Sequence, residues 1–160
     1  NQIHAGNNYR RVVELVQSGA IGEVREIHVW AGAVYGNTGK PVLAEPPSHL
    51  HYDLWLGPVE PRPYSPNYVP IAWRNYWAYG GGTMTDFCCH HMDLSHWALD
   101  LRYPLTVESE GPPVDDVQVP TWLIATFNYP ARGSKPPVKL TWYQGGKRPS
   151  LPERSRSRRR

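Results

Sequence analysis

The sequence predicts an α+β fold: an open-faced, mostly antiparallel β-sheet with helices packed on one face. Two observations carry this prediction. One early segment and three late ones show the alternation of strands, and two other segments carry apolar residues at helical spacing. Hydrophobic residues make up 40% of the 160 residues, which is enough for the core of one domain.

The first two expected elements are a helix and a strand. Residues 8–18 form the helix, since four apolar residues make one stripe and Gly19 follows the last turn. Residues 24–34 form the strand, in which Ile27 and Val29 alternate with Glu26 and His28.

A long segment rich in proline and aromatic residues follows, from 36 to 74. Eight prolines exclude regular helix or sheet throughout. Its Trp and Tyr residues bring burial that offsets the entropy of ordering, so we expect an ordered loop.

The second half of the domain is expected to hold the longest helix and three strands. The helix covers 84–101, and the strands cover 105–110, 117–129 and 138–143. Pro120 requires a sheet edge or a bulge. Residues 1–146 are therefore expected to form the domain, and 147–160 a basic disordered tail.

Charge and composition narrow the classes of function. The formal net charge is +3, but the segment from Lys147 to Arg160 holds seven Lys or Arg and one Glu, so the remaining chain is mildly acidic. Binding of nucleic acid would depend on the tail alone, and we do not expect it. No apolar run approaches the ~20 residues that span a bilayer, so no membrane partner is expected.

Asp86 and His90 are the first candidates for chemistry. They lie one helical turn apart, with Asp93 a further turn on, and the triple glycine Gly80–Gly82 precedes them. A carboxylate beside an imidazole orients the ring, which can then take a proton from a substrate hydroxyl. The alternative is an ordinary ion pair on a helix surface.

Other site chemistries find less support in the sequence. Asp86, His90, His91 and Asp93 carry metal-ligating groups, but adjacent histidines project about 100° apart on a helix and no HExxH or CxxC spacing occurs, so we expect no metal. The adjacent Cys88 and Cys89 form no disulfide framework. No glycine-rich dinucleotide motif, P-loop or G-x-S-x-G occurs, so no cofactor-binding residue is expected in this chain.

Aromatic residues around Arg74 are candidates for binding substrate. Trp and Tyr rings suit sugar rings, and a guanidinium suits carboxylates. The same rings could instead only pin the long loop to the core, and the sequence leaves both readings open. The candidates are Trp55, Trp73, Arg74, Trp77 and Tyr79.

Three motifs, in order, resemble the Gfo/Idh/MocA oxidoreductases, the family of glucose–fructose oxidoreductase and inositol dehydrogenase. The run from Gly80 to Asp93 resembles the signature G-G-G-x-x-x-D-x-G-x-H-x-x-D, with Cys88 where the family has glycine. Tyr52–Pro58 with Arg62-Pro63-Tyr64 is similar to a segment of a bacterial branch. Gly19–Val24 is similar to the junction that opens the family's C-terminal domain.

The resemblance implies the C-terminal half of a two-domain enzyme. NAD or NADP would be bound by an N-terminal Rossmann domain, which is absent from this chain. His90 would be the acid and base at the hydroxyl of a sugar, sugar derivative or cyclitol, and Asp86 would orient His90 or bind the substrate. Asp93 would bind the substrate. The fragment alone is expected to be inactive. A homo-oligomer would form through the open sheet face, in the cytoplasm or periplasm of a bacterium.

A second hypothesis comes from another class of function. The domain could be a non-catalytic module that binds carbohydrate or associates with itself through its sheet. Tight binding of a sugar without any cofactor would favour this alternative over the enzyme.

Overall fold

The structure is a computed structural model that describes residues 3–36 and 38–150. The chain forms four α-helices, one short 3-10 helix and four strands within these residues. In chain order they are α1 (Asn7–Gln17), β1 (Glu26–Trp30), α2 (Tyr52–Leu56), η1 (Ala72–Asn75), α3 (Gly82–His91), α4 (Asp93–Leu99), β2 (Thr106–Glu110), β3 (Leu123–Tyr129) and β4 (Val138–Gln144).

The four strands form one sheet in the order β1-β4-β3-β2. The β3 strand pairs antiparallel with both β2 and β4, and only the pair of β1 with β4 is parallel. Trp142 of β4 stands opposite Val29 of β1 and Ala125 of β3, so these three side chains share one face. The predicted class, an α+β fold with an open and mostly antiparallel sheet, is confirmed.

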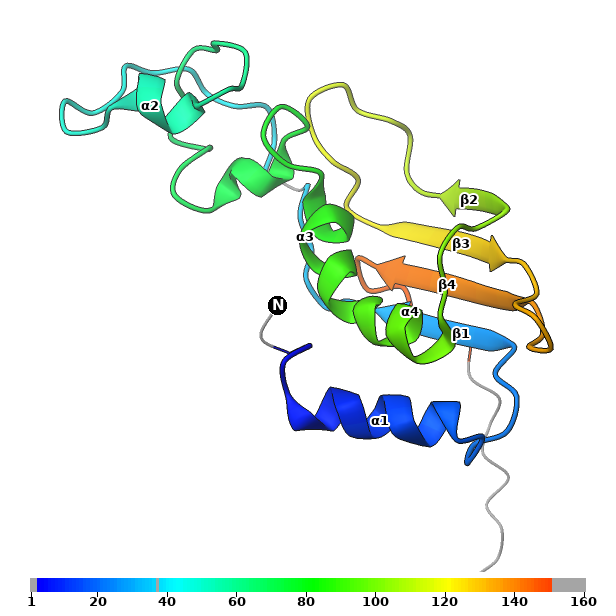
Figure 1. The fold of residues 1–160 in the computed structure, drawn as a ribbon. Helices are drawn as coiled ribbons and strands as arrows, with labels where there is room; N and C mark the ends of the chain where they lie inside the picture. The colour runs from blue at the N-terminus through cyan, green and yellow to red at the C-terminus, as the bar shows by residue number, and fades with distance from the viewer. Residues whose placement is uncertain (1–2, 37, 151–160) are drawn as a thin grey trace, which may run out of the picture.

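That face carries the core of the domain. Leu140 and Trp142 are completely buried, and α1 and α4 add Val13, Ala98 and Leu99 to the same cluster. The helices α3 and α4 cross this face, and α1 packs beside α4 (Figure 1). No helix among the described residues covers the other face, and these residues form no Rossmann domain.

The predicted helix over 84–101 is in fact two helices that meet at Met92. The prediction of one continuous helix was wrong at this point. The hydroxyl of Tyr9 on α1 donates to the His90 carbonyl at 3.2 Å, the acceptor that the Leu94 amide would use in an unbroken helix. A contact from another helix therefore lies at the break.

The predicted strand over 117–129 was right only in its second half. The strand β3 begins at Leu123, after Pro120, which has no amide to donate to a ladder. The residues before it pair elsewhere: the Val119 amide donates to the Asn75 carbonyl, and Trp77 donates to Val117.

The proline-rich segment is ordered and projects from the helix-and-sheet body together with α2 and η1 (Figure 1). Its aromatic rings pack on one another: Tyr68 meets Tyr76 and Tyr79 edge to face, at 5.1 and 4.8 Å between ring centroids. Expected burial of these rings is thus confirmed.

Two further predictions concern the C-terminal tail and the membrane. Residues 151–160 of the expected tail lie outside the described residues. None of the helices in the described ranges is long and apolar enough to cross a membrane.

Candidate active site

The triple glycine lets neighbouring residues pack closely against the backbone at the start of α3. Gly82 has φ of +70°, and a β-carbon there would lie 2.7 Å from Cγ2 of Val119. A β-carbon at Gly80 would lie 3.2 Å from the Trp73 ring, and one at Gly81 would collide with Thr85. The glycines are therefore used for contact inside the domain.

The same geometry tests whether these glycines could cradle a dinucleotide. To bind a dinucleotide, the backbone amides of these glycines would have to be free and point at its phosphates. The Gly81 amide instead donates to the Thr85 hydroxyl at 3.0 Å, and that hydroxyl donates to the Gly82 carbonyl. The run does not fit a pyrophosphate, because the Gly81 amide is already bonded within the domain.

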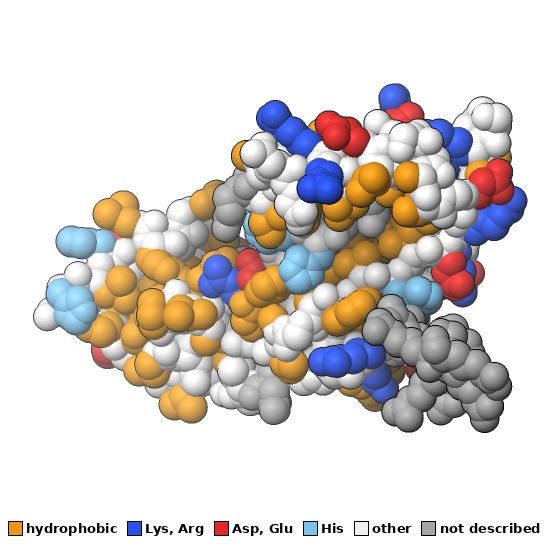
Figure 2. Space-filling view, turned by 90° about the horizontal axis from the view of Figure 1, so that it is seen from below, with side chains coloured by type: hydrophobic (Ala, Val, Ile, Leu, Met, Phe, Trp, Pro, Cys, Tyr) orange, Lys and Arg blue, Asp and Glu red, His pale blue; other side chains and the backbone are white. Residues whose placement is uncertain are grey.

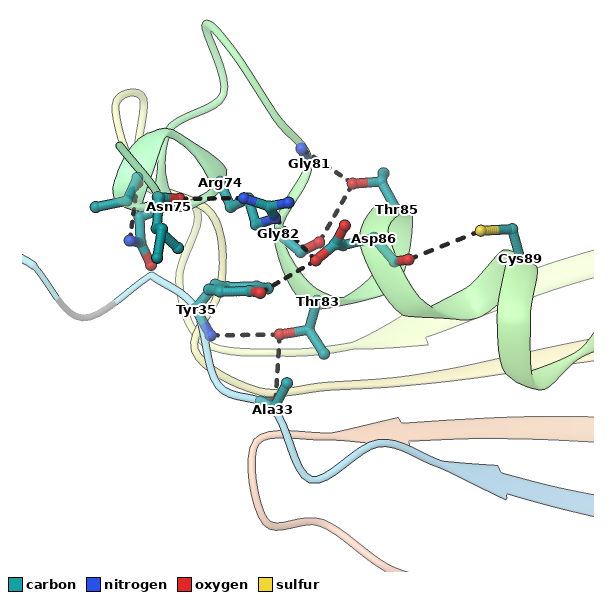
Figure 3. Close-up of polar contacts among 12 residues, drawn as sticks. Ala33, Tyr35, Arg74, Asn75, Gly81, Gly82, Thr83, Thr85, Asp86 and Cys89 are labelled. Atoms are coloured by element: carbon teal, nitrogen blue, oxygen red, sulfur yellow. Dashed lines mark hydrogen bonds and ion pairs between the residues drawn. The ribbon is translucent and has the colours of Figure 1, made fainter. Parts of the chain in front are cut away.

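Asp86, on the first turns of α3, is joined to two groups from elsewhere in the chain. Its Oδ2 atom accepts from Arg74 Nε at 3.0 Å and from the Tyr35 hydroxyl at 3.1 Å (Figure 3). The side chains of Arg74 and Asp86 are 27% and 30% exposed, so the pair is partly shielded but still reachable. Oδ1 accepts no hydrogen bond from the described residues and remains available to a ligand.

A buried polar network fixes the segment that carries Tyr35. The fully buried Thr83 hydroxyl accepts from the Tyr35 amide at 3.3 Å and donates to the Ala33 carbonyl. Asn75 Oδ1 accepts from the Gly36 amide at 2.6 Å. The segment that follows β1 and the start of α3 are thus tied together beside Asp86 (Figure 3).

The pKa of Tyr35 is raised above its usual value. Burial is the largest cause, followed by the hydrogen bond to the Asp86 carboxylate; the positive charge of Arg74 acts in the opposite direction. Tyr35 therefore stays protonated and keeps donating to Asp86 over the ordinary pH range.

A pocket of about 340 Å³ opens beside this carboxylate. Four predicted site residues line it together: Trp73, Arg74, Tyr79 and Asp86. The Arg74 guanidinium lies over the Trp73 ring, 4.2 Å from its centroid, which holds the arginine in place for Asp86.

Trp55 does not line this pocket, but it contacts Tyr79, which does. Its ring meets that of Tyr79 at 5.2 Å, and the hydroxyls of Tyr52 and Tyr79 are 3.2 Å apart. Burial and the neighbouring Tyr52 raise the pKa of Tyr79. For Trp55 the structure favours the reading in which aromatic rings pin the loop.

His90 and Asp93 lie further along the helix axis than this pocket's lining. His90, partly buried at the end of α3, has its carbonyl bonded to Tyr9. Asp93 Oδ2 lies 2.7 Å from Nδ1 of His4, whose ring stacks on Trp97 at 4.3 Å. Asp93 is thus held by the N-terminal segment.

Trp77 lies in a different pocket from Asp86. Its indole Nε1 donates to the Asp115 carbonyl at 2.9 Å, in the loop before β3. The prediction grouped Trp77 with Trp73 because they are close in sequence. In the structure the neighbouring Tyr76 forms a β-bridge with Gln118, which places Trp77 beside the loop before β3.

Sequence reasoning missed Tyr35 as a partner of Asp86. A single tyrosine just after a strand belongs to no periodic pattern, and its contact spans 51 residues. No signal in one sequence would have identified it. Among the described residues, no group of three His, Cys, Asp or Glu side chains could hold a metal ion.

The cysteine that replaces the family's glycine points away from the pocket lining. Cys88 Sγ lies 3.0 Å from Met92 Sδ. Burial raises the pKa of its thiol to about 11, with the neighbouring Cys89 as a smaller cause. The helix accommodates this side chain on its core side.

Comparison with known proteins agrees with this arrangement of helix and sheet. A model of the C-terminal alpha/beta domain of an oxidoreductase family, the Gfo/Idh/MocA family, matches residues 6–135. No curated protein matches the chain. The family match covers α1, the glycine run, α3 and three of the four strands. The chain therefore belongs to the Gfo/Idh/MocA oxidoreductase family, as a C-terminal α/β domain of that family.

Proposed function

We propose that this chain is the substrate-binding and catalytic C-terminal domain of an NAD(P)-dependent oxidoreductase that acts on a hydroxyl of a sugar, sugar derivative or cyclitol. The observation that carries the proposal is the Asp86 carboxylate, which Arg74 and Tyr35 hold at a pocket on α3. Membership of an oxidoreductase family supports the general class of reaction.

Residues of the pocket and of the helix beyond it have distinct roles in this proposal. Asp86 Oδ1 accepts a hydrogen bond from a substrate hydroxyl, while Arg74 and Tyr35 hold Oδ2. The Trp73 ring lines the same pocket and offers an apolar surface to the carbon face of the substrate. His90, one turn along the same helix, takes the proton from the reacting hydroxyl and returns it in the reverse direction.

The nicotinamide cofactor is assigned to a separate Rossmann domain of the complete protein. Membership of the oxidoreductase family supports this assignment, and the glycines Gly80–Gly82 agree with it because they pack closely against Trp73, Thr85 and Val119. When bound, the cofactor supplies the acceptor or donor of a hydride.

The open face of the sheet is proposed as the interface of a homo-oligomer. Trp30 is 47% exposed on that face, beside Tyr143 of the neighbouring strand. The Thr141 hydroxyl on the same face is buried without a hydrogen-bond partner. Sedimentation of Trp30→Glu against the unchanged protein tests this: a shift to a smaller species supports it, and an unchanged species contradicts it.

Binding of nucleic acid is less well supported. Seen from below, Lys and Arg side chains are scattered or lie beside Asp and Glu, while histidines stand among apolar side chains (Figure 2). This view shows no continuous basic stripe of the kind that tracks a phosphate backbone.

The experiment compares the complete protein, the 160-residue chain alone and a His90→Asn variant. Oxidation of a panel of sugars and cyclitols is followed by absorbance of NAD(P)H. We expect turnover only in the complete protein, a loss of at least about 100-fold in kcat for His90→Asn, and unchanged affinity for NAD(P)H. Unchanged kcat in the variant would contradict the role of His90, and turnover by the chain alone would contradict the assignment of the cofactor.

A further inference from the structure

Trp77 belongs to a pocket of about 600 Å³, separate from the lining of the Asp86 pocket. The pocket lies between Trp77 and the loop that precedes β3. Its volume falls in the range of about 300–1,000 Å³ that small-molecule sites occupy. Its lining includes the side chains of Trp77, Asp115 and Gln118.

Backbone hydrogen bonds hold the walls of this pocket together. The Trp77 amide donates to the Val117 carbonyl at 3.1 Å, and the Val119 amide donates to the Asn75 carbonyl at 3.0 Å. Gly36 permits a third approach, because a β-carbon there would collide with the Val119 carbonyl. The pocket is therefore formed before any ligand arrives.

The Trp77 ring is fixed but still exposed. Its one polar atom, Nε1, donates to the Asp115 carbonyl at 2.9 Å, and yet the residue is 47% exposed. A large aromatic ring whose polar atom is already satisfied offers a ligand only its apolar surface.

Asp115 and Gln118 each keep part of their hydrogen-bonding capacity free. Asp115 Oδ1 accepts from the amides of Val117 and Gln118, at 2.8 and 2.7 Å, and these bonds lower the pKa of the carboxyl. Gln118 Oε1 accepts from the Thr38 amide at 3.2 Å. Asp115 Oδ2 and the Gln118 amide nitrogen have no hydrogen bond within the described residues.

We propose that this pocket is a second binding site, and that its ligand is a neutral carbohydrate. The carbon face of a pyranose ring would pack on Trp77. One of its hydroxyls would donate to Asp115, and a neighbouring hydroxyl would accept from Gln118. The pocket lining includes a carboxylate and no Lys or Arg, so sugars that carry a carboxylate or phosphate are disfavoured.

This inference does not rest on the redox proposal. The site needs no cofactor, and none of its residues contacts Asp86 through a hydrogen bond. Failure of one proposal leaves the other standing, because binding is read at Trp77 and turnover at His90.

The test is an NMR titration of the 160-residue chain. The probes are the methyl α- and β-pyranosides of D-glucose, D-galactose and D-mannose, with D-glucuronate as the charged counterpart. We expect at least one neutral probe to shift the indole N–H signal of Trp77 to saturation and glucuronate to bind at least about tenfold more weakly. Absence of any shift, or equal binding of glucuronate, would overturn the proposal.

Three variants complete the experiment. Trp77→Ala should weaken binding at least about tenfold, since it removes the stacking surface. Tyr103→Ala is the control, because Tyr103 is also an exposed aromatic residue (82% exposed) but lies outside the lining of this pocket, and it should bind as the unchanged chain does. Gln118→Met keeps the approximate shape and removes both the amide donor and the oxygen that accepts from the Thr38 amide, so weaker binding with a folded spectrum and unchanged Thr38 signals supports the site. Binding retained in both Trp77→Ala and Gln118→Met would overturn it.

Discussion

Replacing Gly82 by alanine should destabilise the domain more than replacing a glycine that also has positive φ but has open space around it. Gly82 begins α3 with φ of +70°, and a β-carbon there would lie 2.7 Å from Cγ2 of the buried Val119. An L-residue in the left-handed region costs about 1–2 kcal/mol, and forcing a methyl group into a filled contact costs about 1–3 kcal/mol. We therefore expect Gly82→Ala to lose about 2–5 kcal/mol of the free energy of unfolding.

Gly133 provides the matched control for this prediction. Its φ is +61°, and a β-carbon there would meet nothing within 4 Å. Gly133→Ala should therefore lose only the conformational part, about 1–2 kcal/mol. The measurement is equilibrium unfolding in urea, read by tryptophan fluorescence, with the slope against urea checked for equality. Equal losses in the two variants would refute the argument that Gly82 is needed for close approach to Val119.

Two further predictions concern cysteine and the N-terminal segment. Burial raises the pKa of the Cys88 thiol in the folded state from 9.0 to about 11. The contribution of this thiol to the free energy of unfolding is therefore complete below pH 9 and is lost as the pH rises towards 11. A Cys88→Ala variant, unfolded in urea at a series of pH values, should lack this loss. His4→Ala should lose about 0.5–1 kcal/mol in the same assay, since it removes the bond to Asp93 and the stack on Trp97; unchanged stability would contradict this contact.

Helices and strands with a clear apolar period could be predicted from the sequence. The helix expected at 8–18 is observed at Asn7–Gln17, and the strand expected at 138–143 is observed at Val138–Gln144. In β4 the apolar residues Val138, Leu140 and Trp142 all belong to the core cluster. In α1 Val13 and Val16 pack in or against the cluster, whereas Leu15 of the predicted stripe is 47% exposed. Apart from Leu15, local pattern and tertiary burial agree there, so the pattern was sufficient.

The errors occurred where a distant contact decides the local structure. The Tyr9 hydroxyl lies at the break between α3 and α4, and it comes from 81 residues away. Residues 117–119 resemble the start of a strand, but they pair with the segment after η1 rather than with the sheet. Neither partner can be read from a local window of sequence.

The same contrast between nearby and distant contacts applies to the candidate site. Asp86 and Arg74 were both predicted, and they meet at 3.0 Å because only twelve residues separate them across a glycine turn. Tyr35 was missed, and Trp77 lines a different pocket from Trp73 and Arg74. The roles proposed for Asp86 and His90 remain predictions: Asp86 lines the pocket beside Arg74, and His90 does not.

The most direct test of the central claim is single-turnover hydride transfer in the complete protein with Asp86→Asn. The variant keeps the shape of the side chain and removes its charge, and the affinity for NAD(P)H is measured in parallel. We predict that the rate of transfer falls at least about 100-fold while cofactor affinity stays the same. An unchanged rate of transfer would contradict the claim that this chain supplies the substrate side of the active site.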